Sequence, residues 1–267
     1  MIEHPKFKKL VKYLEALDSA IIAYSGGTDS TFLLAAAQIA LKEKFLAITI
    51  DTPYIARWEI EEAVEICETL GVKHRIIQSE IINSIKNNPK DRCYLCKKHL
   101  FTGLLEEARK ENIQYVLDGT NLDDIGDYRP GRRALKELEI KSPLLETGIG
   151  KSLIREFSRQ LNLKTWDKPA YACLLTRIPY DTQIEDDELQ RIEQSEAFLM
   201  DKGFRAVRVR SHGNIARIEI PKEQLSDLLR LNESNEISDM LKKFGYQFVS
   251  IDMDGYRMGS YLVKEKD

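Results

Sequence analysis

The sequence predicts an α/β fold, with a doubly wound parallel sheet followed by a smaller α+β domain. Short apolar segments alternate with helix-length segments through the first two-thirds of the chain, as expected for a parallel sheet flanked by helices. A glycine turn follows the first apolar segment, where open α/β sheets place a ligand loop. From about residue 182 the pattern changes, so we expect two domains, residues 1–168 and 169–267.

Each expected strand of the first domain is a short apolar segment. These strands cover residues 20–24, 45–50, 74–78 and 115–118, with a further one near 140–145. The helices between them have apolar residues at helical spacing and cover 5–16, 29–42, 57–70, 97–111 and 151–161. Asp29 and Ser30 are residue types that cap helix starts, and Gly71 stands where a C-cap glycine is expected.

The second domain begins with an acidic amphipathic helix at 185–202. Residues 206–210 and 216–220 then alternate between apolar and polar side chains around the turn His212-Gly213-Asn214. Alternation of this kind predicts a β-hairpin. The remaining expected elements are two helices and a strand, at 222–231, 234–244 and 247–253.

The composition is that of an ordinary soluble globular protein. The chain has 267 residues, 43% of them hydrophobic and 31% charged. We find no apolar run long enough to span a bilayer and no signal-peptide pattern at Met1, so we expect a cytoplasmic protein without a membrane partner. The net charge of −3 argues against a nucleic-acid partner, because domains that wrap nucleic acid usually carry a basic excess.

The glycine turn is the strongest functional signal in the sequence, and it reads Ser25-Gly26-Gly27-Thr28-Asp29-Ser30. A turn of this kind directs backbone N–H groups and a helix N-terminus at one point, which suits an anion. Gly26 and Gly27 give a permissive backbone, and Ser25, Thr28 and Ser30 add hydroxyl donors. The turn lacks the lysine of the Walker-type phosphate loop. A plain helix cap is the alternative interpretation.

Polar residues also follow two other expected strands. Asp51 follows the strand at 45–50, and the strand at 115–118 leads into Asp118-Gly119-Thr120-Asn121 and then Asp123-Asp124. Solvated turns often have this composition. Because the carboxyl ends of parallel strands lie at one edge of the sheet, these loops and the glycine turn together predict a polar nucleotide pocket.

Four cysteines in a reducing compartment are more often metal ligands, catalytic thiols or core residues than disulfides. Cys67 lies beside apolar residues on an expected helix, and we interpret it as a core residue. Cys93 and Cys96 form a C-x-x-C pair, and Cys173 lies far along the chain. Residue types leave three interpretations open: a redox dithiol, a zinc site completed by Cys173 and His99, or an iron–sulfur cluster held by three thiolates.

The stretch S-G-G-x-D-S at 25–30 resembles the PP-loop ATP pyrophosphatases, and the resemblance narrows to the LarE family of sulfur-insertion enzymes. Further shared stretches are R-C-Y-x-C-K at 92–97, D-G-T-N-x-D-D at 118–124, Y-R-P-G-R-R-A at 128–134, P-A-Y-A-C-L at 169–174, R-V-R at 208–210 and D-M-D-G-Y-R-M-G-S-Y at 252–261. Together they run along almost the whole chain. Thr176 stands where many relatives have serine, and it keeps the hydroxyl.

The resemblance implies that ATP is cleaved to AMP and pyrophosphate while a substrate is activated as an adenylate. LarE enzymes adenylate a carboxylate of pyridinium-3,5-biscarboxylic acid mononucleotide and replace the adenylate with sulfur, for the nickel-pincer nucleotide cofactor of lactate racemase. Some members give up the sulfur of a cysteine at the position of Cys173. Others carry a [4Fe–4S] cluster, which the set Cys93, Cys96 and Cys173 matches. Sulfide or another sulfur donor is then a partner, and the rings that the family forms imply a homo-oligomer.

The resemblance also implies roles for individual residues. Asp51 lies near the nucleoside, and Gly119, Asn121 and Asp124 lie along the phosphates, where Mg²⁺ and cationic side chains offset the negative charge. The other family positions are Arg177 at the cofactor, and Glu196 and Asp227 at a metal or phosphate.

Two arginines of the expected hairpin, Arg208 and Arg210, suit a phosphate of the substrate. They alternate with Val209, so both project from one face of the strand. A solvated strand face is the alternative interpretation.

Three other functions remain open. A tRNA-thiolating enzyme of the same superfamily would show a basic groove and often further C-x-x-C pairs. An amidotransferase-type synthetase would leave Cys93, Cys96 and Cys173 without a role. A non-catalytic nucleotide-binding module with structural zinc would bind ATP or AMP without releasing pyrophosphate.

Overall fold

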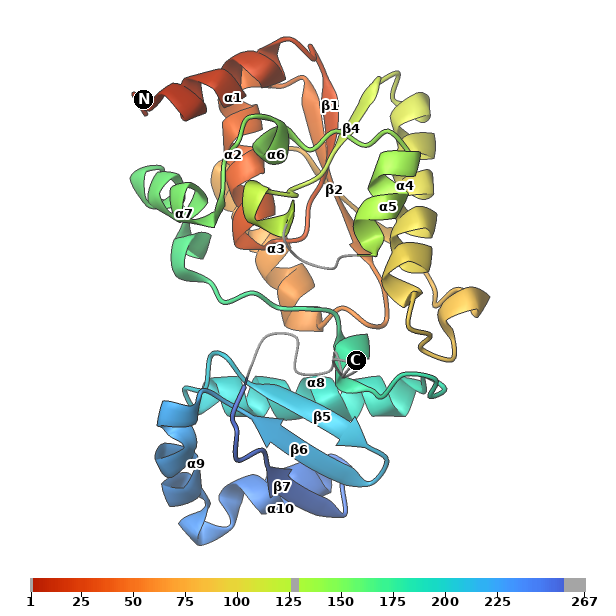
Figure 1. The fold of residues 1–267 in the computed structure, drawn as a ribbon, viewed down its shortest axis with the longest axis vertical. Helices are drawn as coiled ribbons and strands as arrows, with labels where there is room; N and C mark the ends of the chain where they lie inside the picture. Colours follow the sequence, from red (N-terminus) through yellow and green to blue (C-terminus); the bar gives the residue numbers. More distant parts are fainter. Residues whose placement is uncertain (1, 126–129, 257–267) are drawn as a thin grey trace, which may run out of the picture. The chain divides into compact units, whose positions relative to one another are not determined.

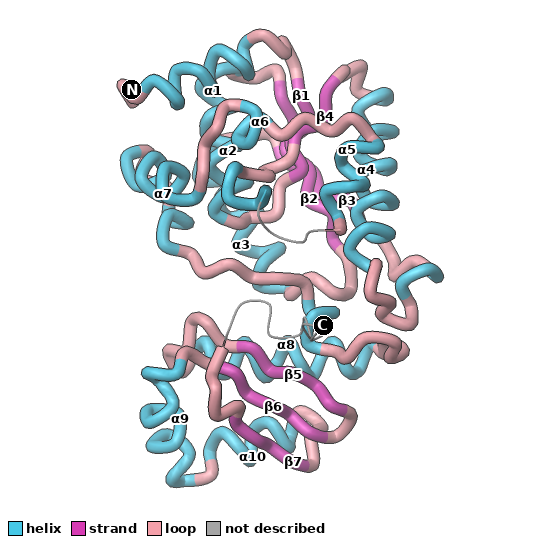
Figure 2. Tube along the Cα trace, in the orientation of Figure 1, coloured by secondary structure: helices cyan, strands magenta, loops and turns pink. Residues whose placement is uncertain are grey.

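The computed structural model describes residues 2–125 and 130–256. Contacts divide the chain into two compact units, and the first runs to Tyr171 apart from Lys86–Lys90, which belongs to the second. Figure 1 follows the chain through both units, and Figure 2 distinguishes their helices, strands and loops. Within the described residues, no helix has both the length and the apolar composition needed to cross a bilayer.

The first unit contains a four-stranded parallel sheet in the order β3-β2-β1-β4. Its strands are β1 (Ala20–Ala23), β2 (Phe45–Asp51), β3 (His74–Gln78) and β4 (Tyr115–Leu117). The chain continues to one side of β1 through β2 and β3, and to the other side through β4. The carboxyl end of β1 is therefore a switch point, where doubly wound sheets bind ligands. The predicted parallel α/β sheet is confirmed.

Helices cover both faces of this sheet because β1 is apolar on both sides. Ala20 and Ile22 share a core with residues of α1, α2, α3 and α7, whereas Ile21 packs with residues of α4 and α5. In Figure 1, α4 and α5 lie on one side of the sheet and α1, α2 and α7 on the other. The helices are α1 (Pro5–Glu15), α2 (Thr28–Leu41), α3 (Arg57–Leu70), α4 (Arg92–Lys110), α5 (Gly131–Glu137), α6 (Pro143–Glu146) and α7 (Lys151–Gln160), with the short helices η1 (Asn83–Ile85), η2 (Leu122–Ile125) and η3 (Lys164–Asp167).

The predicted strand near 140–145 is wrong. Lys141 forms only a single parallel bridge with Leu117, and the chain then enters α6 at Pro143. Proline has no N–H to donate to a sheet and is favoured in the first turn of a helix. The predicted helix at 97–111 begins five residues earlier, at Arg92, and α5 was not predicted. Gly71 ends α3 with φ 65° and ψ 35°, as predicted.

The second unit contains a three-stranded sheet in the order β5-β6-β7. The hairpin of β5 (Arg208–His212) and β6 (Ile215–Glu219) is antiparallel, as predicted, and β7 (Phe248–Ile251) pairs parallel with β6. Val209, Ile218 and neighbouring apolar residues form a core with the helices. The helices are α8 (Asp186–Asp201), α9 (Leu225–Leu231) and α10 (Glu236–Lys243), with η4 (Leu174–Arg177), η5 (Lys222–Gln224) and η6 (Asn232–Ser234).

Candidate active site

The glycine turn lies at the carboxyl end of β1 and leads directly into α2. Gly26 has φ +67°, which glycine adopts without strain, and a Cβ there would lie 3.1 Å from the Cβ of Ala63. The N-cap is Gly27, with no side-chain cap hydrogen bond, so the predicted capping by Asp29 and Ser30 is not found. A glycine N-cap keeps side chains away from the first N–H groups of α2, as an anion site requires.

The hydroxyl groups of the turn bond mainly within the first unit. Ser25 Oγ lies 3.1 Å from Ser30 Oγ, and Ser30 Oγ donates to the carbonyl of Gly27 at 3.2 Å. Thr28 Oγ1 donates to the carbonyl of Thr165 at 2.8 Å. Thr28 therefore anchors the turn to η3, a contact between residues 137 positions apart that local sequence pattern does not indicate.

The loop after β4 packs against the turn. Asn121 Nδ2 donates to Asp29 Oδ2 at 3.0 Å. A Cβ on Gly119 would lie 3.1 Å from the backbone nitrogen of Ser30, so only glycine allows this approach without displacement. Two of the predicted polar segments thus meet at the start of α2.

The loop after β4 is shaped by its own buried carboxylates. Asp118 accepts hydrogen bonds from Thr120 and from Ser142 Oγ, the latter at 2.6 Å. Asp124 Oδ2 accepts from the backbone N–H of Asn121 at 3.1 Å. These bonds replace water around the buried carboxylates, so Asp118 and Asp124 hold the loop in shape.

Asp51 lies at the end of β2, at the same edge of the sheet. Its Oδ1 lies 2.6 Å from a guanidinium nitrogen of Arg57. Arg57 also donates to the carbonyls of Thr52 and Ile55, which fixes the loop between β2 and α3. The loops after β1, β2 and β4 therefore lie at the same edge of the sheet.

The C-x-x-C pair lies in the first two turns of α4, which begins at Arg92. Cys93 is exposed and Cys96 is half-buried. Their i, i+3 spacing makes them neighbours on the surface of the helix. Cys96 Sγ lies 3.2 Å from the hydroxyl of Tyr54, a buried residue of the loop after β2. The pKa of the Cys96 thiol is raised, mainly because the side chain is buried. The hydrogen bond with Tyr54 and the charge of Lys97 lower this pKa in part, and the neighbouring Cys93 raises it. Tyr54 links the thiol pair to the sheet edge that carries the glycine turn.

Cys173 belongs to the second unit, where Arg177 and Glu196 hold its backbone. Arg177 donates to the carbonyls of Ala172 and Cys173 at 2.6 and 3.1 Å. Its other nitrogens donate to both carboxylate oxygens of Glu196 at 2.8 and 2.7 Å. Glu196 Oε1 also accepts from the backbone N–H of Val209 at 2.8 Å. Arg177, predicted at the cofactor, and Glu196, predicted at a metal or phosphate, therefore form an ion pair with each other in this structure.

Asn88, which was not among the predicted site residues, also fixes the segment that follows Cys173. Its Nδ2 lies 3.2, 2.9 and 2.9 Å from the carbonyls of Leu175, Ile178 and Pro179. Asn88 is fully buried and has φ +48°, a conformation that asparagine tolerates better than most residues. The Asn-Pro pair at 88–89 is a turn signal, but its partners lie far along the chain.

The arginines of β5 are buried. Arg208 is 3% and Arg210 is 5% exposed, which excludes the solvated strand face. Arg210 pairs with Glu219 of β6 at 2.8 Å and donates to the carbonyl of Thr176 at 2.6 Å. The guanidinium of Arg208 lies 5.0 Å from the centre of the Tyr256 ring. Both arginines point from one face of the strand, as predicted, and that face is charged and enclosed.

The predicted metal residues do not form a metal site by themselves. Asp227 is exposed and pairs with Arg230 at 3.5 Å, and His99 is exposed on α4. Across the residues that the structure describes, no three His, Cys, Asp or Glu side chains converge to hold a metal ion. Thiols are the residue type that holds iron–sulfur clusters; Cys93 and Cys96 lie on α4 of the first unit, and Cys173 belongs to the second unit.

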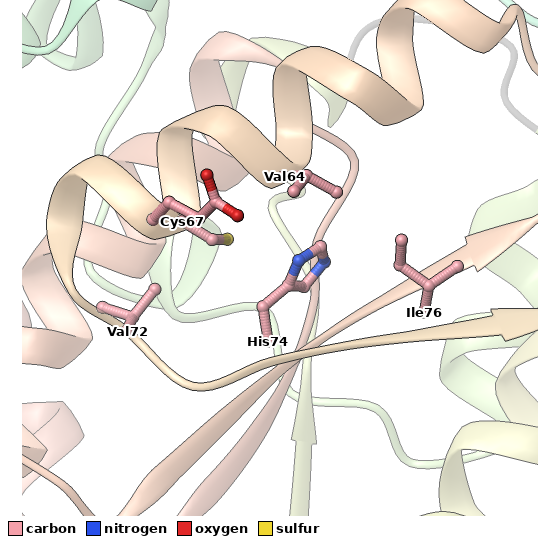
Figure 3. Close-up of a pocket in the computed structure, with 6 residues that line it drawn as sticks. Val64, Cys67, Val72, His74 and Ile76 are labelled. Atoms are coloured by element: carbon pink, nitrogen blue, oxygen red, sulfur yellow. The ribbon is translucent and has the colours of Figure 1, made fainter.

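A cavity of about 410 Å³ lies elsewhere in the first unit, between α3 and β3. Figure 3 shows Cys67 and His74 pointing into it, with Val64, Val72 and Ile76 around them. His74 is the first residue of β3, so the cavity lies toward the amino ends of the strands, away from the edge where nucleotides bind. Cys67 is 1% exposed, which confirms it as a core residue.

Two shared stretches are only partly described. Tyr128 and Arg129 of Y-R-P-G-R-R-A, and residues 257–261 of the C-terminal stretch, lie outside the described residues.

Comparison with known proteins agrees with this geometry. The profile of the queuosine biosynthesis protein QueC matches residues 19–93. Uncharacterized proteins of Synechocystis sp. and Methanocaldococcus jannaschii are each 40% identical to the chain, over 95% and 94% of it and 96% and 98% of their own lengths. The pyridinium-3,5-bisthiocarboxylic acid mononucleotide synthase of Lactiplantibacillus plantarum is 32% identical over 94% of the chain and 91% of its own length.

The parallel sheet, with an S-G-G-x-D-S turn at its switch point, defines an ATP-dependent enzyme of the PP-loop ATP pyrophosphatase class. The similarity to the Lactiplantibacillus synthase covers 94% of the chain and therefore extends through both units. The chain belongs to the LarE family.

Proposed function

We propose that this enzyme inserts sulfur into pyridinium-3,5-biscarboxylic acid mononucleotide at the expense of ATP. The observation that carries the proposal is the hydrogen bond between Tyr54 and Cys96. It ties a thiol pair to the sheet edge that holds the PP-loop, so the groups for activation and for sulfur chemistry share one edge of the first unit. The Lactiplantibacillus relative is named for synthesis of the bisthiocarboxylic acid mononucleotide, which supports the substrate class.

The reaction proceeds in two displacements. A carboxylate oxygen of the substrate attacks the α-phosphorus of ATP, the bond to the bridging oxygen breaks, and pyrophosphate leaves. A sulfide sulfur then attacks the acyl carbon, the bond to the AMP oxygen breaks, and a thiocarboxylate and AMP result. Adenylation is needed because a carboxylate is a poor electrophile without a good leaving group.

The first unit's residues bind and orient the ATP. The N–H groups at Gly27 and the start of α2 face the polyphosphate, while the Asp29–Asn121 hydrogen bond and Gly119 keep the two loops together. Mg²⁺ would bind through the phosphates and one or two carboxylates, as is usual for this ion, and Asp29 is the nearest candidate in the turn. In the second unit, Arg208 and Arg210 would hold the phosphate of the substrate.

A [4Fe–4S] cluster would be held by Cys93, Cys96 and Cys173, and its open iron would present sulfide to the activated carbon. In this proposal Arg177 and Glu196 fix the backbone of Cys173, and Tyr54 orients the side chain of Cys96. The cytoplasmic location, an external sulfur donor and a homo-oligomeric state stay predictions.

Anaerobic purification followed by turnover tests the proposal. We expect brown protein with iron and acid-labile sulfide, and pyrophosphate release that depends on the biscarboxylate nucleotide. Cys93→Ala should lose iron and thiocarboxylate formation while still binding ATP. Cys67→Ala, a thiol of the core, should keep both per mole of folded protein.

Three results would point elsewhere. Colourless protein that contains zinc would contradict the cluster. Colourless, metal-free protein in which Cys173 loses its sulfur after one turnover would establish the sacrificial route. Thiolation of tRNA without thiolation of the biscarboxylate nucleotide would overturn the substrate assignment.

A further inference from the structure

Lys168 is a buried lysine whose ammonium lies against the PP-loop, although it is 140 residues from that loop in the sequence (residue 28 to residue 168). Its side chain is 9% exposed, and lysine is rarely buried to this degree without a partner. The Nζ atom donates to the carbonyl of Gly26 at 3.1 Å and to Glu62 Oε2 at 2.6 Å. It also lies 5.4 Å from the centre of the Trp58 ring.

The main chain around Lys168 is held equally firmly. Arg155 donates to the carbonyl of Lys168 at 3.0 Å and to the carbonyl of Trp166 at 2.9 Å. Thr28 of the PP-loop donates to the carbonyl of Thr165 at 2.8 Å. The segment Lys164–Lys168 is therefore held by Thr28 of the PP-loop and by Arg155 of α7.

The contact between Lys168 and Gly26 determines the direction of a loop N–H group. In a planar trans peptide the carbonyl and the following N–H point in opposite directions. Because the carbonyl of Gly26 points at Lys168, the N–H of Gly27 points to the opposite side of that peptide. Gly27 is the N-cap of α2, so its N–H belongs to the group of donors at the anion position.

The ammonium also supplies positive charge to a loop that has none of its own. Residues 25–30 include one acidic residue, Asp29, and no lysine or arginine. A Walker-type loop has its lysine within the motif. An ammonium has three N–H donors, and Gly26 and Glu62 take two of those on Lys168.

We propose that Lys168 is the positioning residue of the ATP site: it holds the Gly26–Gly27 peptide with its N–H toward the polyphosphate and offsets the polyphosphate charge. This inference rests on ATP binding by the PP-loop and not on sulfur insertion. Its failure can therefore be distinguished from a failure of the proposed substrate.

Binding of inorganic pyrophosphate, MgATP and adenosine by calorimetry tests the inference. Lys168→Met should weaken binding of pyrophosphate and ATP at least about tenfold, the scale of one charge-assisted hydrogen bond, and change adenosine binding less than about twofold. Lys168→Arg, which keeps the charge and the donors, should recover most of the affinity. Lys164→Met is the matched control, because that lysine lies on the same segment with its side chain 74% exposed and pairs with Glu65, and it should bind all three as the wild type does.

Glu62→Gln separates positioning from simple ion pairing. It removes the acidic partner, so the charge of Lys168 is no longer neutralised, while the hydrogen bond to the Gly26 carbonyl stays. Pyrophosphate affinity should therefore stay the same or rise. Wild-type pyrophosphate affinity in folded Lys168→Met would overturn the inference. So would an equal loss of pyrophosphate and adenosine binding, or a loss in Glu62→Gln as large as in Lys168→Met.

Discussion

Arg177 and Glu196 form a buried bidentate ion pair within the second unit. Two guanidinium nitrogens meet the two carboxylate oxygens at 2.8 and 2.7 Å, and the side chains are 1% and 5% exposed. The same guanidinium donates to the carbonyl of Cys173, and the same carboxylate accepts the N–H of Val209. The pair therefore ties the backbone of Cys173 to α8 and β5.

Removing one member of this pair should be costly because it leaves the other charge buried alone. We expect Glu196→Ala to lower the free energy of unfolding of the second unit by about 3–5 kcal/mol, and Glu196→Gln to cost less because the amide oxygen can still accept. Urea unfolding followed by hydrogen exchange at residues 186–219 measures this directly. Gln194→Ala, at an exposed position of the same helix, should change little, and an equal effect of the two alanine variants would contradict the prediction.

Gly119 should be required by its distance to α2 rather than by its backbone conformation. A Cβ there would lie 3.1 Å from the nitrogen of Ser30, so Gly119→Ala must displace the start of α2. We expect a loss of about 1–2 kcal/mol in stability, with ATP affinity falling about tenfold because the displaced N–H groups belong to the anion site.

Gly103→Ala is the matched control. It lies inside α4, where an added Cβ meets nothing within 4 Å. Alanine there should stabilise the first unit by about 0.5–1 kcal/mol and leave ATP binding unchanged. Unchanged ATP affinity in Gly119→Ala would refute the close-approach argument.

The sequence predicted the features that depend on local pattern. The apolar residues Ile21 and Ile22 were enough to place β1, and alternation about Val209 placed the two arginines on one face. The start of α4 was missed because the helix was expected only after the segment Cys93-Tyr94-Leu95-Cys96, although Asp91 at the N-cap position was an available signal.

Contacts between residues far apart in the sequence could not be predicted from local pattern. Nothing in the composition around Lys168 indicates Gly26 or Glu62, and the burial of Arg210 depends on Glu219 across the hairpin. These contacts form only when the helices and strands pack together, so local periodicity does not predict them.

The cysteines should differ in reactivity in the metal-free protein. Cys93 is exposed, Cys96 is half-buried and Cys67 is buried, and burial raises the pKa of Cys67 to about 12. Since the thiolate is the reactive form, alkylation at pH 8 should label Cys93 first, Cys96 more slowly and Cys67 only after unfolding. Peptide mass spectrometry over time measures the order, and early labelling of Cys67 would show that α3 opens away from the sheet.

His74 should make the stability of the first unit depend on pH. Its Nε2 lies 2.8 Å from Thr49 Oγ1, and Thr49 donates its own proton to the carbonyl of Tyr24 at 2.9 Å. Nε2 must therefore carry a proton in the neutral ring. Burial lowers the pKa of His74 in the folded protein, and its neighbours in the cavity include Cys67 and Glu68.

The sign of the effect follows from proton binding. The unfolded chain, with a histidine pKa near 6.5, takes up the proton at a higher pH than the folded protein does. The contribution of His74 is therefore complete above about pH 6.5 and is lost as the pH falls toward the lowered folded pKa. Its slope reaches at most about 1.4 kcal/mol per pH unit for one proton.

Urea unfolding between pH 5 and 8 measures this slope. The two tryptophans, Trp58 and Trp166, both belong to the first unit, so their fluorescence reports on the unit that contains His74. His74→Gln keeps an N–H donor for Thr49 and does not titrate, so its stability should fall less steeply below pH 6.5 than that of the wild type. His212→Gln, which removes the other histidine whose pKa burial lowers, lies in the second unit and should leave the tryptophan-detected slope unchanged. Parallel curves for wild type and His74→Gln would show that protonation of His74 does not limit stability.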